Sequence, residues 1–418
     1  MAMTLTENIL SKASGKSSVS PGDIVEAKID IALTHETLGP IAFQEFEKIG
    51  GKVWDPDRIT VFADHLAPPA NMQQGELLKV TSQFVKDQGI SHFYPYEGVE
   101  HQLMAEKGFD VPGTVIVGTD SHTVTSGAFG AFATGIGSSE MVSVFLTGSL
   151  WFRIPETIKF HISGKLRDGV MSKDVLLRLI QEIGPDGATY KAIEYDGPTI
   201  SQMSIDGRMV LSNMSVEMGA KNGIIEPDAK TLQYLKTRVK RKFKTVKADA
   251  KANYRDVYDI EVSKLDPLIA CPHTLEKQNL KSVREVDGKI DQAFLGSCTG
   301  GRLEDIRMGA RIMKRRKVHP DVRMIVTPAS REIYLNALKE GLIELFAKAG
   351  AIVCNPGCGP CVGYHQGILG KDQVCISSQN RNFRGRMGNP DSEIYVASPA
   401  TVTASAIEGK IADPLKYL

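Results

Sequence analysis

The 418-residue sequence predicts an α/β protein with open, mainly parallel sheets flanked by helices. The first observation is that strand and helix patterns alternate in the last third, as in the apolar stretch 294–298 and the helical stretch 303–314. The second is that polar side chains directly follow buried-strand patterns in the first third. Ligands bind at the carboxyl ends of strands in open α/β sheets, so both observations predict a site at such an edge.

Composition limits the class of protein. A hydrophobic content of 42% with 24% charged residues indicates a soluble globular chain of two or three domains. The balance of 50 basic and 49 acidic residues argues against a dedicated nucleic-acid or membrane-surface protein. No apolar run of about 18 residues and no leader pattern is present, so we expect no membrane span and a cytoplasmic location. The six unevenly spaced cysteines do not suggest a disulfide framework, which leaves thiolates available for a metal.

In the first third, a histidine follows each of four predicted strand ends. Strand patterns cover 24–33 and 59–63, a helix is expected over 72–87, and the segments 90–96 and 113–118 follow. The polar groups after these segments are His35, Asp64-His65, His101 and Asp120-Ser121-His122. An aspartate bonded to one imidazole nitrogen fixes the tautomer and raises its basicity, which suits proton transfer near neutral pH. A single histidine is more often structural, but the set predicts a site.

The small-residue stretch 126–137 is not a dinucleotide fingerprint. It begins with Gly127-x-x-Gly130 but lacks the strand, the full glycine pattern and the acidic residue in proper order. We expect a helix there, packed closely on its neighbours through glycine and alanine.

A change of composition near Ile154 indicates a second domain. A strand leading to Ile162 opens it, and a helix is expected over 172–183. A further helix over 209–219 places Asn213 and Glu217 on one face, which is either part of a site or simply solvated. We predict three domains: residues 1–155, 156–262 and 263–418.

Cysteines dominate the last domain. Cys298 follows a strand pattern, and Cys358-Gly-Pro-Cys361 presents two more thiols from a turn. Three thiolates suit a catalytic zinc with one open position or an iron–sulfur cluster with one under-ligated iron. Cys354 is either a fourth ligand or a buried apolar thiol. A Cys-x-x-Cys pair alone also fits a redox pair.

The basic segments of the second half of the chain have alternative interpretations. A strand pattern at 374–377 leads to Arg381 and Arg386, which either clamp carboxylates or are merely exposed. The stretches 236–251 and 314–317 favour solvated helices or loops over a nucleic-acid surface. Between them, helices are expected over 303–314 and 331–349 and a strand over 322–326.

Taken together, these segments resemble the aconitase superfamily over essentially the whole chain, most closely its isopropylmalate and homoaconitate branch. The motifs that carry the resemblance are Asp64-His65, Glu100-His101-Gln102, Gly118-Thr-Asp120-Ser-His122-Thr, Ser212-Asn213-Met-Ser-Val-Glu217, Gly296-Ser-Cys298-Thr, Cys358-Gly-Pro-Cys361 and Asn380-Arg381-Asn-Phe-Arg-Gly-Arg386. The resemblance implies a three-domain core without the mobile fourth domain of single-chain relatives.

The resemblance also implies roles for residues. Cys298, Cys358 and Cys361 correspond to the ligands of one 4Fe-4S cluster per subunit. The expected catalytic set is Asp64, His65, His101, Asp120, His122 and Glu217, with His65 as proton donor and with His101–Asp120 and His122–Glu217 as supporting pairs. The expected substrate-binding set is His35, Ser121, Asn213, Asn380, Arg381 and Arg386.

Departures from aconitase proper define the expected branch. His35 stands where aconitase carries glutamine and Thr125 where it carries asparagine, which favours isopropylmalate or homoaconitate over citrate. Gly300 replaces the usual asparagine, so contacts near Cys298 are expected to differ. The serine base is expected on the swivelling domain of a separate small subunit.

The implied activity is that of a hydro-lyase and isomerase, active only with that partner. Its expected substrate is a hydroxy-dicarboxylate or tricarboxylate: 2-isopropylmalate in leucine biosynthesis, or else homocitrate, homoaconitate or a dimethylmalate. Rival readings are an RNA-binding regulator when cluster-free and an electron-transfer protein with a fully ligated cluster.

Overall fold

The computed structural model describes residues 2–418, which form two compact units that interleave along the chain. The first unit comprises residues 2–96, 103–163 and 188–260, and the second comprises 97–102, 164–187 and 261–418. The expected division into three domains stays a prediction. None of the helices among the described residues is long and apolar enough to cross a membrane.

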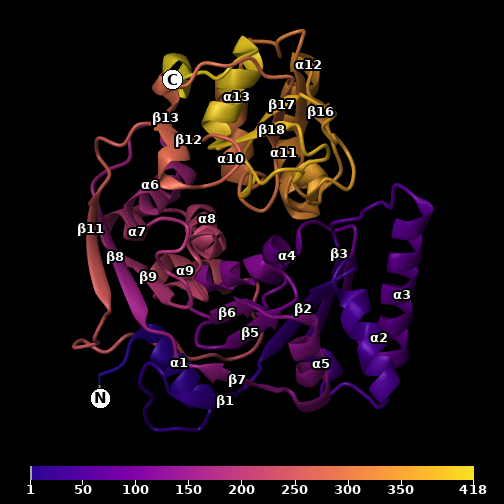
Figure 1. Cartoon of the computed structure of the whole chain (residues 1–418), viewed down its shortest axis with the longest axis vertical. Coiled ribbons are helices and arrows are strands. Elements are labelled where there is room, and N and C mark those ends of the chain that lie inside the picture. The colour runs from indigo at the N-terminus through magenta and orange to yellow at the C-terminus, as the bar shows by residue number, and fades with distance from the viewer. Residues whose placement is uncertain (1) are drawn as a thin grey trace. The chain divides into compact units, whose positions relative to one another are not determined.

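The first unit is built on a five-stranded parallel sheet in the order β4-β3-β2-β5-β6 (Figure 1). The strands are β2 (Ile31–His35), β3 (Ile59–Ala63), β4 (His92–Pro95), β5 (Val115–Gly118) and β6 (Phe132–Gly135). The prediction of one strand over 24–33 is wrong, since β1 (Ile24–Lys28) pairs antiparallel with β7 (Ser149–Arg153) in a separate ribbon. Between β1 and β2, the Asp30 carboxylate accepts from the Val115 amide at 2.9 Å.

Helices α1 (Leu5–Ala13), α2 (Gly39–Ile49), α3 (Met72–Gln88) and α5 (Ser138–Thr147) belong to the same unit. Asn71 caps the amino end of α3 and Gly89 ends it in the left-handed conformation, which confirms the predicted helix. Phe43 of α2 stacks on Phe84 of α3 at 4.0 Å, and Phe145 of α5 joins the cluster. These fully buried rings stabilise the unit by about 2–3 kcal/mol each.

A second sheet of the first unit has the order β10-β9-β8-β11. It contains β8 (Thr157–Ser163), β9 (Ala192–Asp196), β10 (Asn222–Ile225) and β11 (Asp256–Glu261), with helices α7 (Pro198–Gln202), α8 (Ile205–Asn213) and α9 (Ala229–Leu235). The helix predicted to reach Gly219 ends earlier, because α8 tightens into the 3-10 helix Met214–Met218.

The helix predicted over 126–137 is wrong in its second half. The 3-10 helix Ser121–Phe129 ends at Gly130, whose φ of 78° is left-handed, and the chain then enters β6. The glycines do serve close packing, since a Cβ on Gly127 would meet the Gly223 carbonyl oxygen at 2.0 Å.

The second unit has a seven-stranded sheet in the order β13-β12-β18-β17-β14-β15-β16. Its strands are β12 (Leu268–Ala270), β13 (Leu280–Ser282), β14 (Gln292–Leu295), β15 (Arg323–Val326), β16 (Ile352–Val353), β17 (Val374–Ser377) and β18 (Glu393–Ala397). The strands from β18 to β16 run parallel, and β12 is antiparallel to both of its neighbours. The α/β class with mainly parallel sheets is therefore confirmed.

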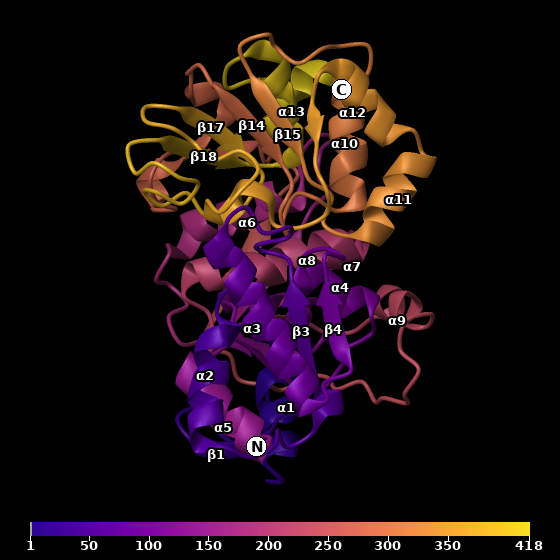
Figure 2. The same ribbon diagram turned by 90° about the vertical axis from the view of Figure 1, so that its right-hand side faces the viewer.

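Helices α6 (Ser172–Ile183), α10 (Leu303–Met313), α11 (Arg331–Lys339), α12 (Leu342–Ala349) and α13 (Pro399–Glu408) belong to this unit. Helix α13 packs on β14 and on α10 (Figure 2). The single helix predicted over 331–349 is two helices, because Gly341 adopts a φ of 73° between them. The remaining helix, α4 (Glu100–Glu106), has residues in both units.

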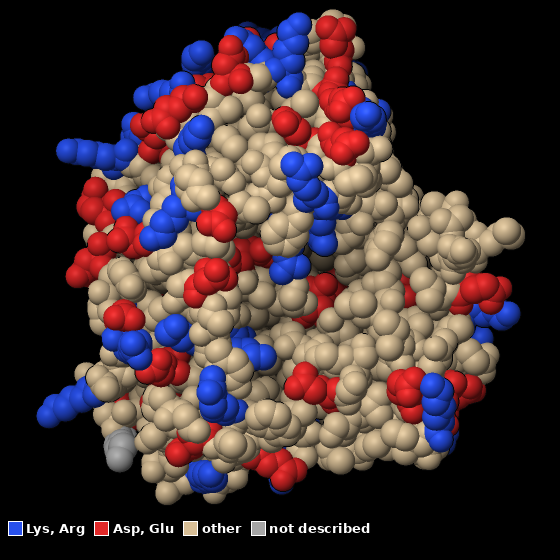
Figure 3. Space-filling model, viewed as in Figure 1, with Lys and Arg blue, Asp and Glu red and all other residues tan. Residues whose placement is uncertain are grey.

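Charged side chains of both signs are interspersed on the face drawn in Figure 3. This pattern agrees with the near balance of 50 basic and 49 acidic residues in the sequence.

Candidate active site

Three neighbouring strands of the first unit deliver polar side chains to one edge of the sheet. Strand β2 ends at His35, β3 is followed by Asp64 and His65, and β5 leads to Asp120 and His122. Because β3, β2 and β5 are adjacent and parallel, their carboxyl ends lie together. Three of the four predicted groups therefore meet at one edge of the sheet, whereas His101 lies on helix α4; that the set forms a catalytic site stays a prediction.

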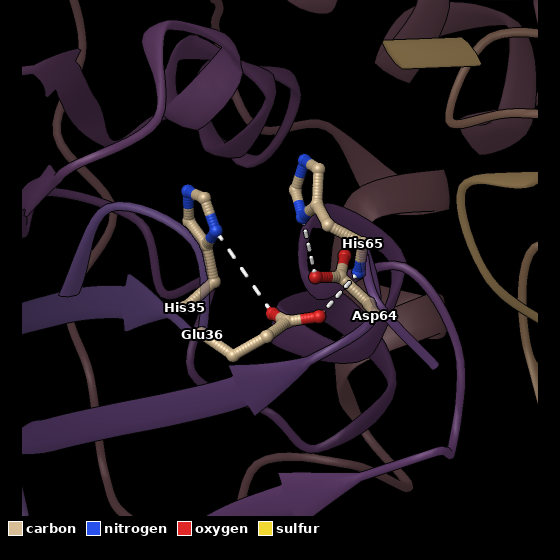
Figure 4. A group of neighbouring side chains, drawn as sticks. All are labelled: His35, Glu36, Asp64 and His65. Atoms are coloured by element: carbon tan, nitrogen blue, oxygen red, sulfur yellow. Dashed lines mark hydrogen bonds and ion pairs between the residues drawn. The ribbon is translucent and has the colours of Figure 1, made fainter. Parts of the chain in front are cut away.

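Glu36 is the centre of the first part of this region (Figure 4). Its Oε1 accepts from the backbone amides of His65 and Leu66 at 2.8 and 2.5 Å, so it fixes the loop after β3. The His35 ring lies 4.3 Å from the His65 ring, nearly parallel to it, and its Nδ1 is 4.0 Å from Glu36 Oε2. The sequence analysis missed Glu36, although a carboxylate beside a histidine at a strand end was a usable signal.

The Asp64–His65 pair is buried and tightly joined. Asp64 Oδ1 lies 2.7 Å from His65 Nδ1. Burial opposes the charged imidazole, but the carboxylates of Asp64 and Glu36 outweigh it and raise the pKa of His65 to about 10. Burial and the Asp64 charge raise the pKa of Glu36 to about 7, against the effect of His65. His65 is therefore charged at neutral pH and has a proton to donate.

His122 lies between two carboxylates. Its Nδ1 is 3.2 Å from Asp120 Oδ1 and its Nε2 is 3.0 Å from Glu217 Oε1. Glu217 is buried, so the alternative of a solvated helix face is wrong. With both nitrogens engaged, the ring is held in one orientation.

Asn213 is linked to the same group through Thr125. Asn213 Nδ2 donates to Thr125 Oγ1 at 2.8 Å, and Thr125 Oγ1 donates to the His122 carbonyl at 2.6 Å. Ser121 is half-buried, with its Oγ 3.5 Å from His122 Nδ1. The residues predicted from the helix 209–219 and from the loop after β5 thus belong to one network.

The second unit contains His101, whose Nε2 is 3.7 Å from Glu100 Oε1. Next to it, Gln102 Oε1 accepts from Nε of the fully buried Arg302 at 3.0 Å, which ties the segment 97–102 to the amino end of α10. The expected pairing of His101 with Asp120 joins residues of different units and stays a prediction.

The second unit also holds the three predicted thiol ligands, and all three are buried. Cys298 lies on the loop after β14. Cys358 immediately precedes the 3-10 turn Gly359–Val362 that follows β16, and Cys361 lies within that turn. Ser297 Oγ lies 3.6 Å from Cys298 Sγ and 3.7 Å from Cys361 Sγ, so the two loops share a partner.

Two of the predicted substrate ligands stand beside these sulfurs. Asn380 Nδ2 is 3.4 Å from Cys298 Sγ, and Arg386 donates to Cys361 Sγ at 3.8 Å. Arg381 is half-buried, with its guanidinium 6.0 Å from the Phe383 ring.

The donor set fits a soft metal group. All six cysteines are free, and only thiols make up the converging group, as iron–sulfur clusters require. Three thiol donors suit either a catalytic zinc with one open position or an iron–sulfur cluster with one under-ligated iron.

Lys173, on the first turn of α6, was not predicted. Its fully buried ammonium donates to Thr299 Oγ1 at 2.9 Å and to the carbonyls of Ser378 and Gln379 at 2.5 and 2.7 Å. Burial lowers the pKa of Lys173 to about 7, although Asp305 and the thiols of Cys298 and Cys361 oppose this. A lysine on the apolar face of an amphipathic helix was the available signal.

Two further cysteines pack in the same hydrophobic cluster as Cys361. Cys375 is inside β17, where burial raises the pKa of its thiol to about 12. Cys354 is half-buried and packs against this cluster, and its role as a fourth ligand stays untested.

Comparison with known proteins decides the family. The model of the aconitase family (aconitate hydratase) matches residues 7–409. The chain belongs to the aconitase family. Members of this family carry an iron–sulfur cluster, in agreement with the three buried thiols.

Relatives match the chain of this aconitase family member end to end. It is 53% identical to the probable 3-isopropylmalate dehydratase large subunit of Methanothermobacter thermautotrophicus, over 99% of each chain. It is 50% identical to the probable methanogen homoaconitase large subunit of the same organism, over 99% of this chain and 97% of that one. The crystal structure of Thermococcus kodakaraensis aconitase X (holo-form) has a TM-score of 0.50 at 10% identity, over 85% and 84% of the two chains, which supports the fold alone.

Proposed function

We propose that the chain is the large, cluster-carrying subunit of a hydro-lyase and isomerase that interconverts 2-isopropylmalate and 3-isopropylmalate by dehydration and rehydration. The charged Asp64–His65 pair carries the proposal, because an imidazolium with a buried carboxylate behind it suits protonation of a leaving hydroxyl. The 53% identity to a probable 3-isopropylmalate dehydratase large subunit supports the choice of substrate. We place the reaction in leucine biosynthesis, in the cytoplasm.

Cys298, Cys358 and Cys361 would hold a 4Fe-4S cluster. When bound, such a group supplies Lewis-acid polarisation of the substrate C–O bond. Ser297 and Asn380 contact the thiols and would fix their orientation. Lys173 ties the Cys298 loop to the Asn380 loop, so it would set the spacing between metal ligands and substrate ligands.

The other residues bind substrate or hold protons. Arg381 and Arg386 would bind substrate carboxylates, because a guanidinium offers two parallel donors to a carboxylate. His65 Nε2 would give its proton to the departing hydroxyl, while Asp64 holds Nδ1 and keeps the ring oriented. His122, held between Asp120 and Glu217, would orient neighbouring polar groups rather than react itself.

The base that removes the carbon-bound proton would come from a small subunit with a serine on a swivelling domain. The relatives named large subunits support such a partner. We therefore expect the chain alone to turn over substrate at background level.

The test is anaerobic reconstitution with iron and sulfide, followed by turnover of 2-isopropylmalate with and without candidate small subunits, monitored by alkene absorbance. Activity that requires the partner supports the proposal. An intact cluster with no turnover under any pairing would overturn it.

Homoaconitase is the second candidate, because the relative with that name is 50% identical over nearly the same length. Homocitrate and homoaconitate belong in the same assay. A kcat/KM for homoaconitate at least tenfold above that for 2-isopropylmalate with the same partner would assign the chain to that branch.

A further inference from the structure

A cavity of about 870 Å³ opens on the first unit, in a place that the proposed reaction does not use. Four segments far apart in the sequence line it: the end of α1, the approach to β2, the approach to β5 and the loop after α9. Its basic residues are Lys12, Lys28, Arg241, Lys242 and Lys244. Its volume lies in the range of pockets for small organic ligands, about 300–1,000 Å³.

The cavity lies at the amino ends of strands of the five-stranded sheet, whereas the histidines of the same unit lie at the carboxyl ends. Asp30 directly precedes β2 and Thr114 directly precedes β5, and both residues line the cavity. His35 and Asp120 stand at the other ends of these two strands. Strands of four or five residues at about 3.3 Å per residue separate the two edges by about 15 Å.

The five cations have no carboxylate partner in the described part of the chain, and all are exposed. The acidic residue of the cavity wall, Asp30, is already engaged, since it accepts from the Val115 amide and lies 3.7 Å from Arg58. With a net charge of only +1 for the whole chain, this is a local concentration of positive charge.

The second basic stretch, 314–317, provides a contrast. It borders a smaller hollow of about 460 Å³ in the second unit. There Lys348 pairs with Glu344, Lys317 donates to the Lys348 carbonyl, and Arg316 donates to the Ile312 carbonyl at 2.6 Å. These three cations pair with a carboxylate or donate hydrogen bonds to backbone carbonyls, whereas the cations of the larger cavity have no carboxylate partner within residues 2–418.

The loop that carries three of the cations is anchored on both sides. Val239 and Phe243 pack on one hydrophobic core cluster, and Val246 and Ala248 pack on another. Asn8 Nδ2 also donates to the Lys247 carbonyl at 2.9 Å. The backbone that carries these basic side chains is therefore held beside the cavity before any ligand arrives, which reduces the entropy cost of binding.

The lining combines two chemistries. Phosphate groups are multivalent anions, and lysine and arginine side chains without carboxylate partners bind them through charge-assisted hydrogen bonds. Val111, Pro112 and half-buried Phe243 add an apolar and aromatic part of the wall. We propose that this cavity is a binding site for a polyphosphate that carries an aromatic group, that is, a nucleoside di- or triphosphate.

Calorimetric titration of the full-length chain with ATP, GTP, tripolyphosphate and adenosine tests the proposal. We expect both nucleotides to bind more tightly than tripolyphosphate, and adenosine not to bind. Raising the salt concentration from 50 to 300 mM weakens binding at least fivefold, because screening acts on exposed charges. Absence of nucleotide binding at 50 mM salt would overturn the proposal.

Variants locate the site. The double substitution K242E/K244E is expected to weaken ATP binding at least tenfold, while K314E/K317E, which changes the net charge equally, leaves it within twofold. F243L keeps an apolar side chain in the core but removes the ring, so it weakens ATP binding and spares tripolyphosphate. Equal losses in the two double variants would mean that only net charge matters, which contradicts a built site.

A single-stranded RNA of ten nucleotides completes the test. If RNA binds at this surface, we expect ATP to compete with it for the site. Tight RNA binding that ATP does not displace, together with weak ATP binding, would replace the nucleotide site with a nucleic-acid surface.

Discussion

The polar region of the first unit and the thiol region of the second are built in different ways. In the first, imidazoles and carboxylates meet at 2.7–3.2 Å, so their charges are paired within the fold itself. In the second, the contacts to Cys298 and Cys361 are 3.4–4.0 Å long and come from weak partners of sulfur. The imidazole–carboxylate groups are thus preorganised by the fold, whereas the thiols form a donor set that suits a soft metal.

The largest effect is expected from the thiol region. Cys358→Ser removes a soft ligand, so the reconstituted protein should lose its iron and its turnover should fall to background. Iron and sulfide analysis with the visible absorption spectrum measures this. The control is Cys271→Ser, a half-buried cysteine outside the group, which should keep full iron content. Full iron in both variants would refute the assignment of ligands.

The next largest effect tests the imidazole–carboxylate region. His65→Asn should lower kcat by about 10²–10⁴-fold while iron content stays constant, because only the proton donor is lost. The matched control is His161→Asn, which breaks another His–Asp pair of 2.7 Å, His161 with Asp196, that is partly exposed. A similar loss of kcat in both variants would show that the position of His65 has no special role.

A third test asks whether the hydrogen bonds of the Lys173 ammonium, rather than packing alone, stabilise the thiol region. Lys173→Met keeps most of the buried volume but leaves the Gln379 carbonyl without its ammonium partner, while Thr299 still donates to the Ser378 carbonyl. We expect the free energy of unfolding to fall by about 1–3 kcal/mol and iron to be lost faster. Urea unfolding and chelator kinetics measure both. Lys264→Met, at an exposed lysine of the same unit, should change neither.

The smallest expected effect is on the pH dependence of stability, and it concerns Asp110, a buried carboxyl without a cationic partner among the described residues. Burial raises the pKa of Asp110 to about 7, and the Ser126 hydroxyl opposes this. The folded state then keeps a proton that the unfolded chain releases near pH 4, so this residue's contribution to stability is full below pH 4. It falls by at most about 1.4 kcal/mol per pH unit up to pH 7 and is flat above.

Asp110→Asn should remove that slope, so its stability relative to the wild type should increase between pH 4 and 7. Urea unfolding at pH 4.5, 5.5, 6.5 and 7.5 measures the difference. Asp259→Asn, at an exposed aspartate, should run parallel to the wild type. A parallel course for Asp110→Asn would mean that Asp110 is ionised in the folded protein.

The sequence predicted much of the site because strand periodicity places residues at strand ends. Asp64, His65, Asp120 and His122 follow apolar runs, and parallel strands bring such ends together. Glu36 and Lys173 were missed because their role depends on which backbone groups approach them, the amides after β3 and the carbonyls after β17. Local patterns could mark these two residues as unusual, but they do not encode which backbone groups the side chains contact.

Element boundaries were less predictable for local reasons. Gly341 and Gly130 adopt left-handed conformations that end helices whose apolar pattern continues beyond them. The strand expected over 24–33 is two strands, because β1 pairs with β7 in a separate ribbon while β2 pairs with β3 and β5. In each case a backbone conformation or tertiary strand pairing overrides the local pattern.

The spacing of the thiols along the chain bears on how the protein is made. Cys358 lies 60 positions after Cys298, and the stretch between them contains α10, β15, α11, α12 and β16. A ribosome must release all of these elements, and they must dock in order, before the three sulfurs converge. We therefore expect metal loading to follow folding during biogenesis, so that newly made chains pass through a folded, cluster-free stage that depends on the assembly machinery of the cell.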